Sequence, residues 1–472
     1  MAVHTAHPAL RSRAFEDQWA ELTDVPLEVT GTLPAAVTGT LHRIVPTAFN
    51  WPKGSFQHWF DGHGQVHSVA IADGRARYTN RFVETPALAR SKKTGRPGSN
   101  FGTKDSGIFG AFGPPMGTAN TNVVKLGDRL LALQEGSQPQ AMDPVTLETL
   151  GPTDLGFLAG GEGLSAHPHW DPRRREVVAA NLVFGKDPMA RVHTLDAVGA
   201  HLGAFAIALP YTPVLMHDFG LSANHVLVPV FPHTCQILKV LAGLTSLNGA
   251  SRWEPEKGAF VYVAKRDGSG LRRYELPPMY SFHVVNSFEE ADTLVMDLVG
   301  YDTGEIVDQI GRVRLASSPA VQPGRIERVR LYADGRSEVT TLQDGVSFEF
   351  PRIDPRRQGV ANRYSFYVAS RLDGARATED AFAAVARLDA ETGDLSRWFA
   401  PEGHQVGEAV PVAKPDGRGD DAVWLLSVVY DPAIHRSRVV VLDGEALEAG
   451  PMAEILLPHH VPLGFHGNWS RA

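Results

Sequence analysis

Four histidines lie on four separate segments of the chain, in surroundings where a solvated imidazole is not expected. His217 follows the apolar run 213–216, and His167, His283 and His466 are flanked by apolar, proline or glycine residues. A single histidine of this kind is more often a core residue that hydrogen-bonds to the backbone than a metal ligand. Four of them, spread from residue 167 to residue 466, predict a common partner.

Neutral imidazoles are suitable ligands for iron, copper, nickel or zinc, whereas magnesium and calcium prefer oxygen. The chain has one cysteine, Cys235, which excludes a zinc cluster built on thiolates and an internal disulfide, and which favours a reducing compartment. A zinc ion with four histidines would be closed to substrate, whereas an octahedral ferrous ion would keep two positions free. The residues therefore predict a metal held by nitrogen or oxygen and leave its identity open.

Three glutamates, Glu135, Glu349 and Glu408, lie in apolar or constrained sequence contexts. Ligating imidazoles usually donate their second N–H to a carboxylate or a carbonyl group. A buried carboxylate without a partner is costly, so each glutamate is expected to have one. Each could orient a ligating histidine or could form a structural salt bridge.

Short strands recur along the chain and are joined by turns rich in glycine, aspartate and asparagine. Strands 66–72 and 75–80 flank one Asp-Gly turn, and strands 326–333 and 336–341 flank another. The number of strands is larger than a single β-sandwich contains, whereas radial repetition of four-stranded sheets accommodates a chain of this length as one closed unit. The pattern predicts a β-propeller, in which residues distant in sequence meet at the central axis.

The 472-residue chain is 43% hydrophobic and 21% charged, which is ordinary for a globular protein. No linker divides it, so we expect one domain over residues 1–472, with a polar N-terminal leader at 1–25. The net charge of −8 and the lack of a large basic cluster disfavour nucleic-acid binding. The sequence does not predict the oligomeric state.

Neither a signal-peptide pattern nor an apolar run of about 20 residues is found, so a cytoplasmic location is expected. The most apolar exposed candidate is the segment 235–247, which has apolar residues at helical spacing and a single charge, Lys239. It could lie on a membrane surface as a peripheral contact, or line the mouth of a site for an apolar ligand. An ordinary helix packed on its own domain is the alternative.

Together, several segments resemble those of the carotenoid cleavage oxygenase family. They fall in the same order along nearly the whole chain: 60–67, 80–82, 119–123, 133–136, 166–168, 216–219, 282–289, 349–352 and 464–467. The resemblance implies an all-β fold, a seven-bladed β-propeller with a few helices and loops that cap the metal-bearing face.

The resemblance also implies the site. A non-haem ferrous ion, Fe(2+), would lie on the propeller axis, bound by His167, His217, His283 and His466. Three outer carboxylates would orient three of those rings: Glu135, Glu349 and Glu408. Thr121 matches a family residue whose methyl group crowds one open position and would steer O₂ to the other. The family splits a conjugated double bond with O₂ into two carbonyl products, so positioning an apolar alkene in a dry tunnel matters more than acid–base groups.

The substrate is indicated by two positions, one directly before Glu135 and one in an upstream loop. Relatives that cleave hydroxylated stilbenes or phenylpropenes are similar in using a lysine just before this glutamate and a tyrosine in an upstream loop to hold and ionise a phenol. Here these positions are Gln134 and Phe101. The prediction is therefore an Fe(II)-dependent dioxygenase acting on a carotenoid or apocarotenoid, with O₂ as co-substrate. The same chemistry on an aromatic olefin is the alternative, and a non-catalytic lipid-binding propeller that keeps the metal is a third hypothesis.

The remaining histidines singled out by their positions have no counterpart among the family's ligands. His169 lies two residues after His167 and is predicted to be structural or to support the site from outside. Four others are predicted to be structural or loop residues: His58, His63, His67 and His404.

Overall fold

The computed structural model describes residues 9–98, 100–104, 117–159, 162–318, 320–371 and 382–471. Residues 1–8 of the expected leader lie outside these ranges.

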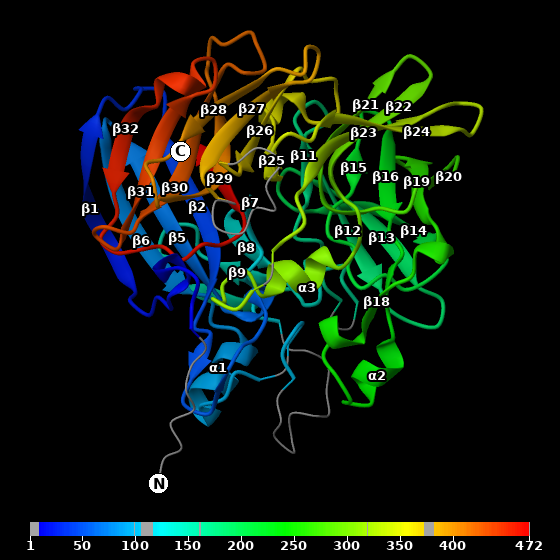
Figure 1. Ribbon diagram of the computed structural model, residues 1–472, viewed down its shortest axis with the longest axis horizontal. Helices are drawn as coiled ribbons and strands as arrows, with labels where there is room; N and C mark the ends of the chain where they lie inside the picture. Colours follow the sequence, from blue (N-terminus) through cyan, green and yellow to red (C-terminus); the bar gives the residue numbers. More distant parts are fainter. Residues whose placement is uncertain are drawn as a thin grey trace.

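Five four-stranded sheets stand as separate blades (Figure 1). The first contains, in spatial order, β10 (Thr149–Pro152), β9 (Gln140–Met142), β8 (Arg129–Leu133) and β7 (Asn122–Leu126). The second contains β11 (His169–Asp171), β12 (Glu176–Val183), β13 (Met189–Asp196) and β14 (His201–Ala208). The third contains β15 (Gly220–Leu221), β16 (His225–Val230), β19 (Ala259–Lys265) and β20 (Arg272–Leu276). The fourth contains β21 (Tyr280–Glu290), β22 (Thr293–Tyr301), β23 (Arg325–Leu331) and β24 (Ser337–Gln343). The fifth contains β25 (Phe348–Arg352), β26 (Tyr364–Ala369), β27 (Ala384–Asp389) and β28 (Leu395–Phe399).

A nine-stranded sheet joins the two ends of the chain. Its order is β29 (Gln405–Ala413), β30 (Val423–Asp431), β31 (Arg436–Asp443), β32 (Pro451–Leu456), β1 (Leu22–Gly31), β6 (Arg75–Phe82), β5 (His63–Ala72), β2 (Gly39–Thr47) and β33 (Gly467–Arg471). Strand β1 pairs with β32 on one side, where Glu28 lies opposite Leu456, and with β6 on the other, where Leu27 lies opposite Ala76.

This arrangement confirms the all-β, propeller-like fold but differs from the predicted count of seven separate blades. Five blades are separate, because β1 hydrogen-bonds to both of its neighbours and merges the remaining nine main strands into one sheet. The C-terminal boundary predicted for the polar leader, residue 25, is also wrong, because it falls inside a strand. Strand β1 begins at Leu22, whose backbone N–H donates to the Asn80 side chain, so the last leader residues belong to a strand.

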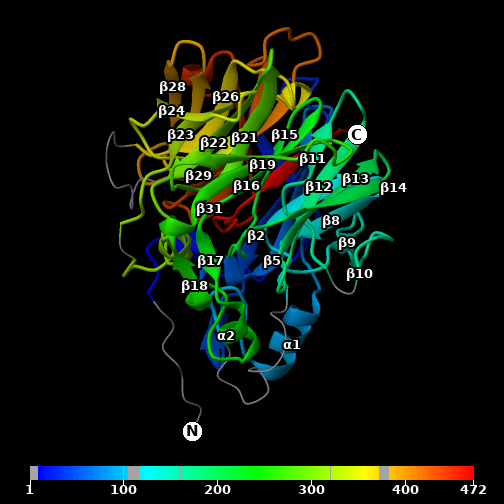
Figure 2. The same ribbon diagram turned by 90° about the vertical axis from the view of Figure 1, so that its right-hand side faces the viewer.

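The smaller elements lie between and beside the blades. Two short hairpins pair β3 (Asn50–Trp51) with β4 (Gly54–Ser55), and β17 (His233–Cys235) with β18 (Ser251–Trp253). The helices are α1 (Pro86–Thr94), α2 (Ile237–Leu241) and α3 (Ile306–Gly311). Single 3₁₀ turns are η1 (Arg13–Phe15), η2 (Trp59–Asp61), η3 (Asn248–Ala250), η4 (Pro255–Lys257), η5 (Pro355–Arg357) and η6 (Leu447–Ala449). Figure 2 shows α1 and α2 together at one end of the molecule, beyond the strands.

Local sequence explains where several elements begin and end. In α1 the Thr85 hydroxyl accepts from the Leu88 backbone N–H, Pro86 starts the helix, and Gly95 ends it with a φ of 67°. The predicted Asp73-Gly74 turn joins β5 to β6 with positive φ at both residues, as a tight hairpin requires. The second predicted hairpin has a longer loop, because pairing stops at Leu331 opposite Ser337.

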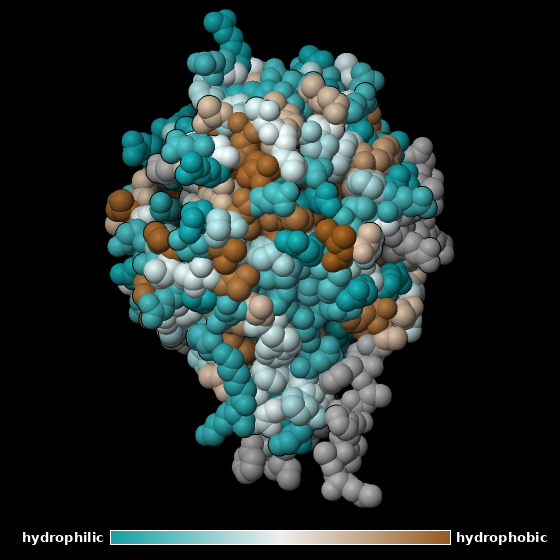
Figure 3. All heavy atoms as spheres, turned by 90° about the vertical axis from the view of Figure 1, so that its left-hand side faces the viewer, coloured by the Kyte–Doolittle hydropathy of each residue, from teal (hydrophilic) through white to brown (hydrophobic). Residues whose placement is uncertain are grey.

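Strands near the propeller axis are buried on both faces, whereas outer strands alternate or face solvent. Strand β21 is buried along nearly its whole length, and β14 is largely exposed. The edge strands β15, β21, β25, β29, β33 and β7 contact one another in that order, and so surround the axis. Seen from the side of β1 and β32, the surface is mainly hydrophilic, with hydrophobic residues in small groups (Figure 3). Within the described ranges, no helix is long and apolar enough to cross a membrane.

Candidate metal centre

The four predicted histidines meet at the propeller axis although they come from four different parts of the chain. His167 precedes β11, His217 precedes β15, His283 lies in β21 and His466 directly precedes β33. One ring nitrogen of each lies within 4.8 Å of the others. The Nε2 atoms are 3.0 Å apart for His167 and His217, 3.1 Å for His217 and His283, and 3.2 Å for His283 and His466.

Three of these rings have a carboxylate on the opposite nitrogen. Nδ1 of His217 contacts Glu135, Nδ1 of His283 lies 2.6 Å from Glu349, and Nδ1 of His466 lies 2.8 Å from Glu408. A neutral imidazole that donates from Nδ1 carries its lone pair on Nε2, so the glutamates assign the tautomers. Three Nε2 lone pairs then face one another at little more than 3 Å. Such an arrangement is repulsive unless a cation lies between the nitrogens.

The nitrogen spacing and the donor set both fit a transition metal. A metal–nitrogen bond of about 2.1 Å places neighbouring ligands about 3.0 Å apart around an octahedron and about 3.4 Å apart around a tetrahedron. Two of the Nε2 distances, 3.0 and 3.1 Å, lie closer to the octahedral value, and the third, 3.2 Å, lies midway between the two. Nitrogen ligands alone disfavour magnesium and calcium.

Burial supports neutral ligands at two of the four positions. Burial lowers the pKa of His466 to about 4 despite the neighbouring Glu408. Burial and the three surrounding histidines hold the pKa of His167 well below its ordinary value. Burial also acts to lower the pKa of His283, but the Glu349 carboxylate outweighs it and the net shift is upward. For His167 no carboxylate partner is found among the described residues, so its ring differs from the other three.

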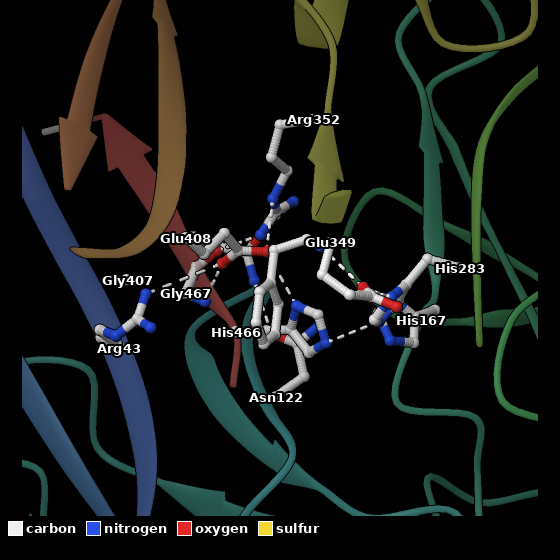
Figure 4. Close-up of polar contacts among 12 residues, drawn as sticks. Arg43, Asn122, His167, His283, Glu349, Arg352, Gly407, Glu408, His466 and Gly467 are labelled. Atoms are coloured by element: carbon white, nitrogen blue, oxygen red, sulfur yellow. Dashed lines mark hydrogen bonds and ion pairs between the residues drawn. The ribbon is translucent and has the colours of Figure 1, made fainter. Parts of the chain in front are cut away.

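The three glutamates are held by different sets of donors. Glu349 in β25 accepts from the Tyr301 hydroxyl at 2.5 Å and from the backbone N–H of Phe350 at 2.8 Å. Glu408 in β29 is 1% exposed and accepts from Arg352 Nε at 2.9 Å and from the Gly467 N–H at 2.8 Å (Figure 4). No pattern in the sequence indicated Tyr301. Arg352 could have been identified, because it is the last residue of the segment 349–352 that resembles the family.

A cavity of about 770 Å³ opens onto this cluster. Its walls are mainly aromatic and aliphatic and include Trp59, Phe60, Phe282, Phe348 and Phe465. Thr121 also lines it: its hydroxyl lies 3.1 Å from Asn120 Oδ1, and its carbonyl accepts from the His466 backbone N–H.

The apolar segment 235–247 lines this cavity through Ile237, Leu238, Val240 and Leu247. The structure therefore favours the mouth of an apolar ligand site over a helix that only packs against its own domain. Leu238 itself remains 78% exposed.

The positions singled out beside the cluster have these contacts. Gln134 Oε1 accepts from the backbone N–H groups of Thr118 and Ala119, and Phe101 lines the cavity. His169 lies outside the cluster, where its Nε2 is 2.9 Å from Asp218. The other four histidines each contact a residue outside the cluster: His58 contacts Val307, His63 contacts Ser91, His67 contacts Tyr78 and His404 contacts Asp431.

A family model described as retinal pigment epithelial membrane protein, RPE65, matches residues 15–471. The chain belongs to the RPE65/carotenoid cleavage oxygenase family. This membership confirms the predicted family and, with it, the predicted class of enzyme, an oxygenase that cleaves carbon–carbon double bonds.

Relatives of this family oxygenase match it over nearly their full length. It is 30% identical to apocarotenoid-15,15'-oxygenase of Synechocystis over 96% of this chain and 94% of that protein. It is 28% identical to a carotenoid cleavage oxygenase of Mycobacterium tuberculosis over 95% of each. The solved structure of cobalt-substituted Synechocystis apocarotenoid oxygenase matches with a TM-score of 0.90 and 28% identity, and covers 98% of both chains.

Proposed function

We propose that this oxygenase holds a ferrous ion through His167, His217, His283 and His466, and cleaves a conjugated double bond of a carotenoid or apocarotenoid. The observation that carries the proposal is three carboxylate-oriented imidazoles whose Nε2 lone pairs face one point at the wall of an apolar cavity. When bound, the ion would supply the activation of O₂ beside the alkene. One O₂ then accounts for both carbonyl oxygens of the two products.

The protein's own residues position the reactants. Glu135, Glu349 and Glu408 would fix three ligand rings, and the methyl group of Thr121 would restrict where O₂ approaches. The apolar walls exclude water and hold the polyene, so rate enhancement rests on orientation and not on proton transfer.

We also propose that the fold acts as one domain of seven radial units. The nine-stranded sheet then counts as two blades that share an edge at β1, and these add to the five separate blades. The pairing of β1 with β32 and of β2 with β33 supports this, because it ties the first and last strands into one closed array.

A substrate panel distinguishes a polyene from an aromatic olefin. Gln134 and Phe101 offer neither a cation nor a hydroxyl to a phenol, which supports the polyene. The relatives nevertheless include isoeugenol monooxygenase of Pseudomonas nitroreducens, 27% identical, and resveratrol cleavage oxygenase 1 of Aspergillus fumigatus, 28% identical. We expect iron-loaded protein to consume O₂ with apocarotenals and to release shorter aldehydes, which mass spectrometry identifies. Resveratrol and isoeugenol should give little product. Aromatic aldehydes alone would contradict the polyene, and tight binding without O₂ uptake would indicate a non-catalytic lipid binder.

We further propose that the protein is cytoplasmic and touches a membrane where its substrate dissolves. Leu238 and Leu244 are 78% and 69% exposed, and both belong to the segment 235–247 that lines the cavity. Replacing both leucines with aspartate is expected to lower partitioning onto phosphatidylcholine vesicles by about 1000-fold, since each buried leucine contributes about 2 kcal/mol and about 1.4 kcal/mol corresponds to a factor of ten. Vesicle co-sedimentation measures this change. The matched control is Val198→Asp, 72% exposed in the turn between β13 and β14, which should bind like the unaltered protein. Equal loss in both variants would contradict a specific contact.

A further inference from the structure

The three outer carboxylates are not equivalent: Glu408 and Glu349 each accept from three donors, but only Glu408 is paired with arginines among the described residues. Its Oε1 accepts from His466 Nδ1 at 2.8 Å and from Arg352 Nε at 2.9 Å, and its Oε2 accepts from the Gly467 N–H at 2.8 Å. Glu135, in contrast, is hydrogen-bonded to His217 and to no other described side chain. Both oxygens of Glu408 are therefore fixed by neighbouring residues, whereas the carboxylate of Glu135 has only the His217 side chain and its own backbone N–H as partners among the described residues.

A second guanidinium group faces Glu408 from the other side. Arg43 in β2 is 3% exposed, and its Nη1 lies 4.0 Å from Glu408 Oε2. Its Nη2 donates to the Gly464 carbonyl at 3.5 Å, just before His466. Gly407 makes room for it, because a Cβ at that position would lie 2.6 Å from Arg43 Nη2. Figure 4 shows Arg43 of β2 and Arg352 of β25 approaching Glu408 from two different strands.

Arg352 also restrains the backbone beside the ligand. Its Nη2 donates to the Gly467 carbonyl, and Asn468 Oδ1 lies within 3.4 Å of Nη1. The arginine thus connects Glu408 to the first residues of β33, directly after His466.

We propose that Arg352 and Arg43 are positioning residues of the metal centre, which hold Glu408 in one orientation and thereby fix the ring of His466. This inference rests on the proposed function, since it requires that the four histidines bind a metal. The physical reason is rotational: a carboxylate with one donor can turn about its side-chain torsions, whereas one held from both sides cannot. Preorganised ligands lose less freedom when the ion binds. Removing an arginine that holds Glu408 should therefore weaken metal binding through His466, without moving the other three histidines.

Cobalt(II) binding to the metal-free, full-length protein tests the positioning role of Arg352 and Arg43 without relying on turnover. We expect Arg352→Met to weaken cobalt affinity by about 10–100-fold, the usual effect of losing an outer partner of a ligand, when measured by competition with a chromophoric chelator. Arg352→Lys should recover part of the affinity, because an ammonium group retains a charged donor. The rise in melting temperature on adding cobalt should shrink in parallel.

The chain offers a matched control in Arg328, which forms a buried ion pair with Asp297 at 2.7 Å but touches none of the four histidines. Arg328→Met should lower the melting temperature of the metal-free protein while leaving cobalt affinity unchanged. If Arg352→Met does not fold, Gly407→Ala displaces Arg43 instead and should also weaken cobalt binding.

The outcomes separate the inference from the function on which it rests. If the unaltered protein does not bind cobalt, the proposed metal site is wrong. If it binds cobalt and Arg352→Met binds equally well, or loses no more affinity than Arg328→Met, the positioning role is wrong.

Discussion

Replacing His283 with alanine is expected to abolish metal binding and oxygenase activity, whereas replacing His169 with alanine should leave both nearly intact. His283 Nε2 lies 3.1 Å from that of His217 and 3.2 Å from that of His466, so its loss removes the nitrogen between two others. His169 points away from the cluster to Asp218, whose other oxygen accepts from the Val284 N–H.

The measurement is metal content after loading with ferrous iron and dialysis, together with O₂ uptake on an apocarotenal. His169→Ala serves as the control, because it also deletes a half-buried imidazole two residues from a proposed ligand. It should lose some stability through Asp218, whose remaining partners are backbone N–H groups. Equal loss of iron in the two variants would show that the ligand assignment near residue 167 is wrong.

The residues that could be predicted from sequence are those whose local surroundings conflict with their chemistry. A histidine between phenylalanine and valine, as at position 283, or a glutamate between two phenylalanines, as at position 349, needs a partner wherever the chain places it. Neighbouring residues alone therefore indicated that His283 and Glu349 need partners, and the structure brings the two within 2.6 Å. Their roles as ligand and orienting carboxylate followed only from the resemblance to the family.

Features that depend on long-range pairing could not be predicted in this way. The sequence of β1 does not reveal that it pairs with β32 more than 400 residues later, where Val29 lies opposite Ile455. This pairing merges two groups of strands and changes the number of separate sheets. Arg43 is a similar case: it lies between His42 and Ile44 in β2, and its sequence neighbours do not reveal that its charge is buried beside Glu408 from the distant strand β29.

The three glutamates should also differ in how much they stabilise the metal-free protein, with Glu408→Ala the most destabilising. Removing this carboxylate leaves Arg43 and Arg352 without their shared counterion, and breaking a buried ion pair from one side costs about 3–5 kcal/mol. Glu135→Ala leaves only the His217 N–H without an acceptor, which costs about 1–3 kcal/mol. Urea unfolding in the presence of a chelator measures both, and Glu408→Gln should fall between Glu408→Ala and the unaltered protein. Equal midpoints for Glu408→Ala and Glu135→Ala would contradict the ranking.

The pH dependence of this difference follows from the charges around Glu408. Burial acts to raise the pKa of Glu408, but Arg352, His466 and Arg43 outweigh it and hold the pKa well below the ordinary value of 4.5. A carboxylate with a lowered folded-state pKa contributes stability above its unfolded-state value, and this contribution is lost only as the pH falls through the folded-state value. The deficit of Glu408→Ala should therefore stay constant from neutral pH down to about pH 5 and shrink only in stronger acid. A deficit that vanished between pH 7 and pH 5 would mean that the two arginines do not hold Glu408 ionised, because burial raises the pKa of a carboxylate that lacks such partners and would let it gain protons in that range.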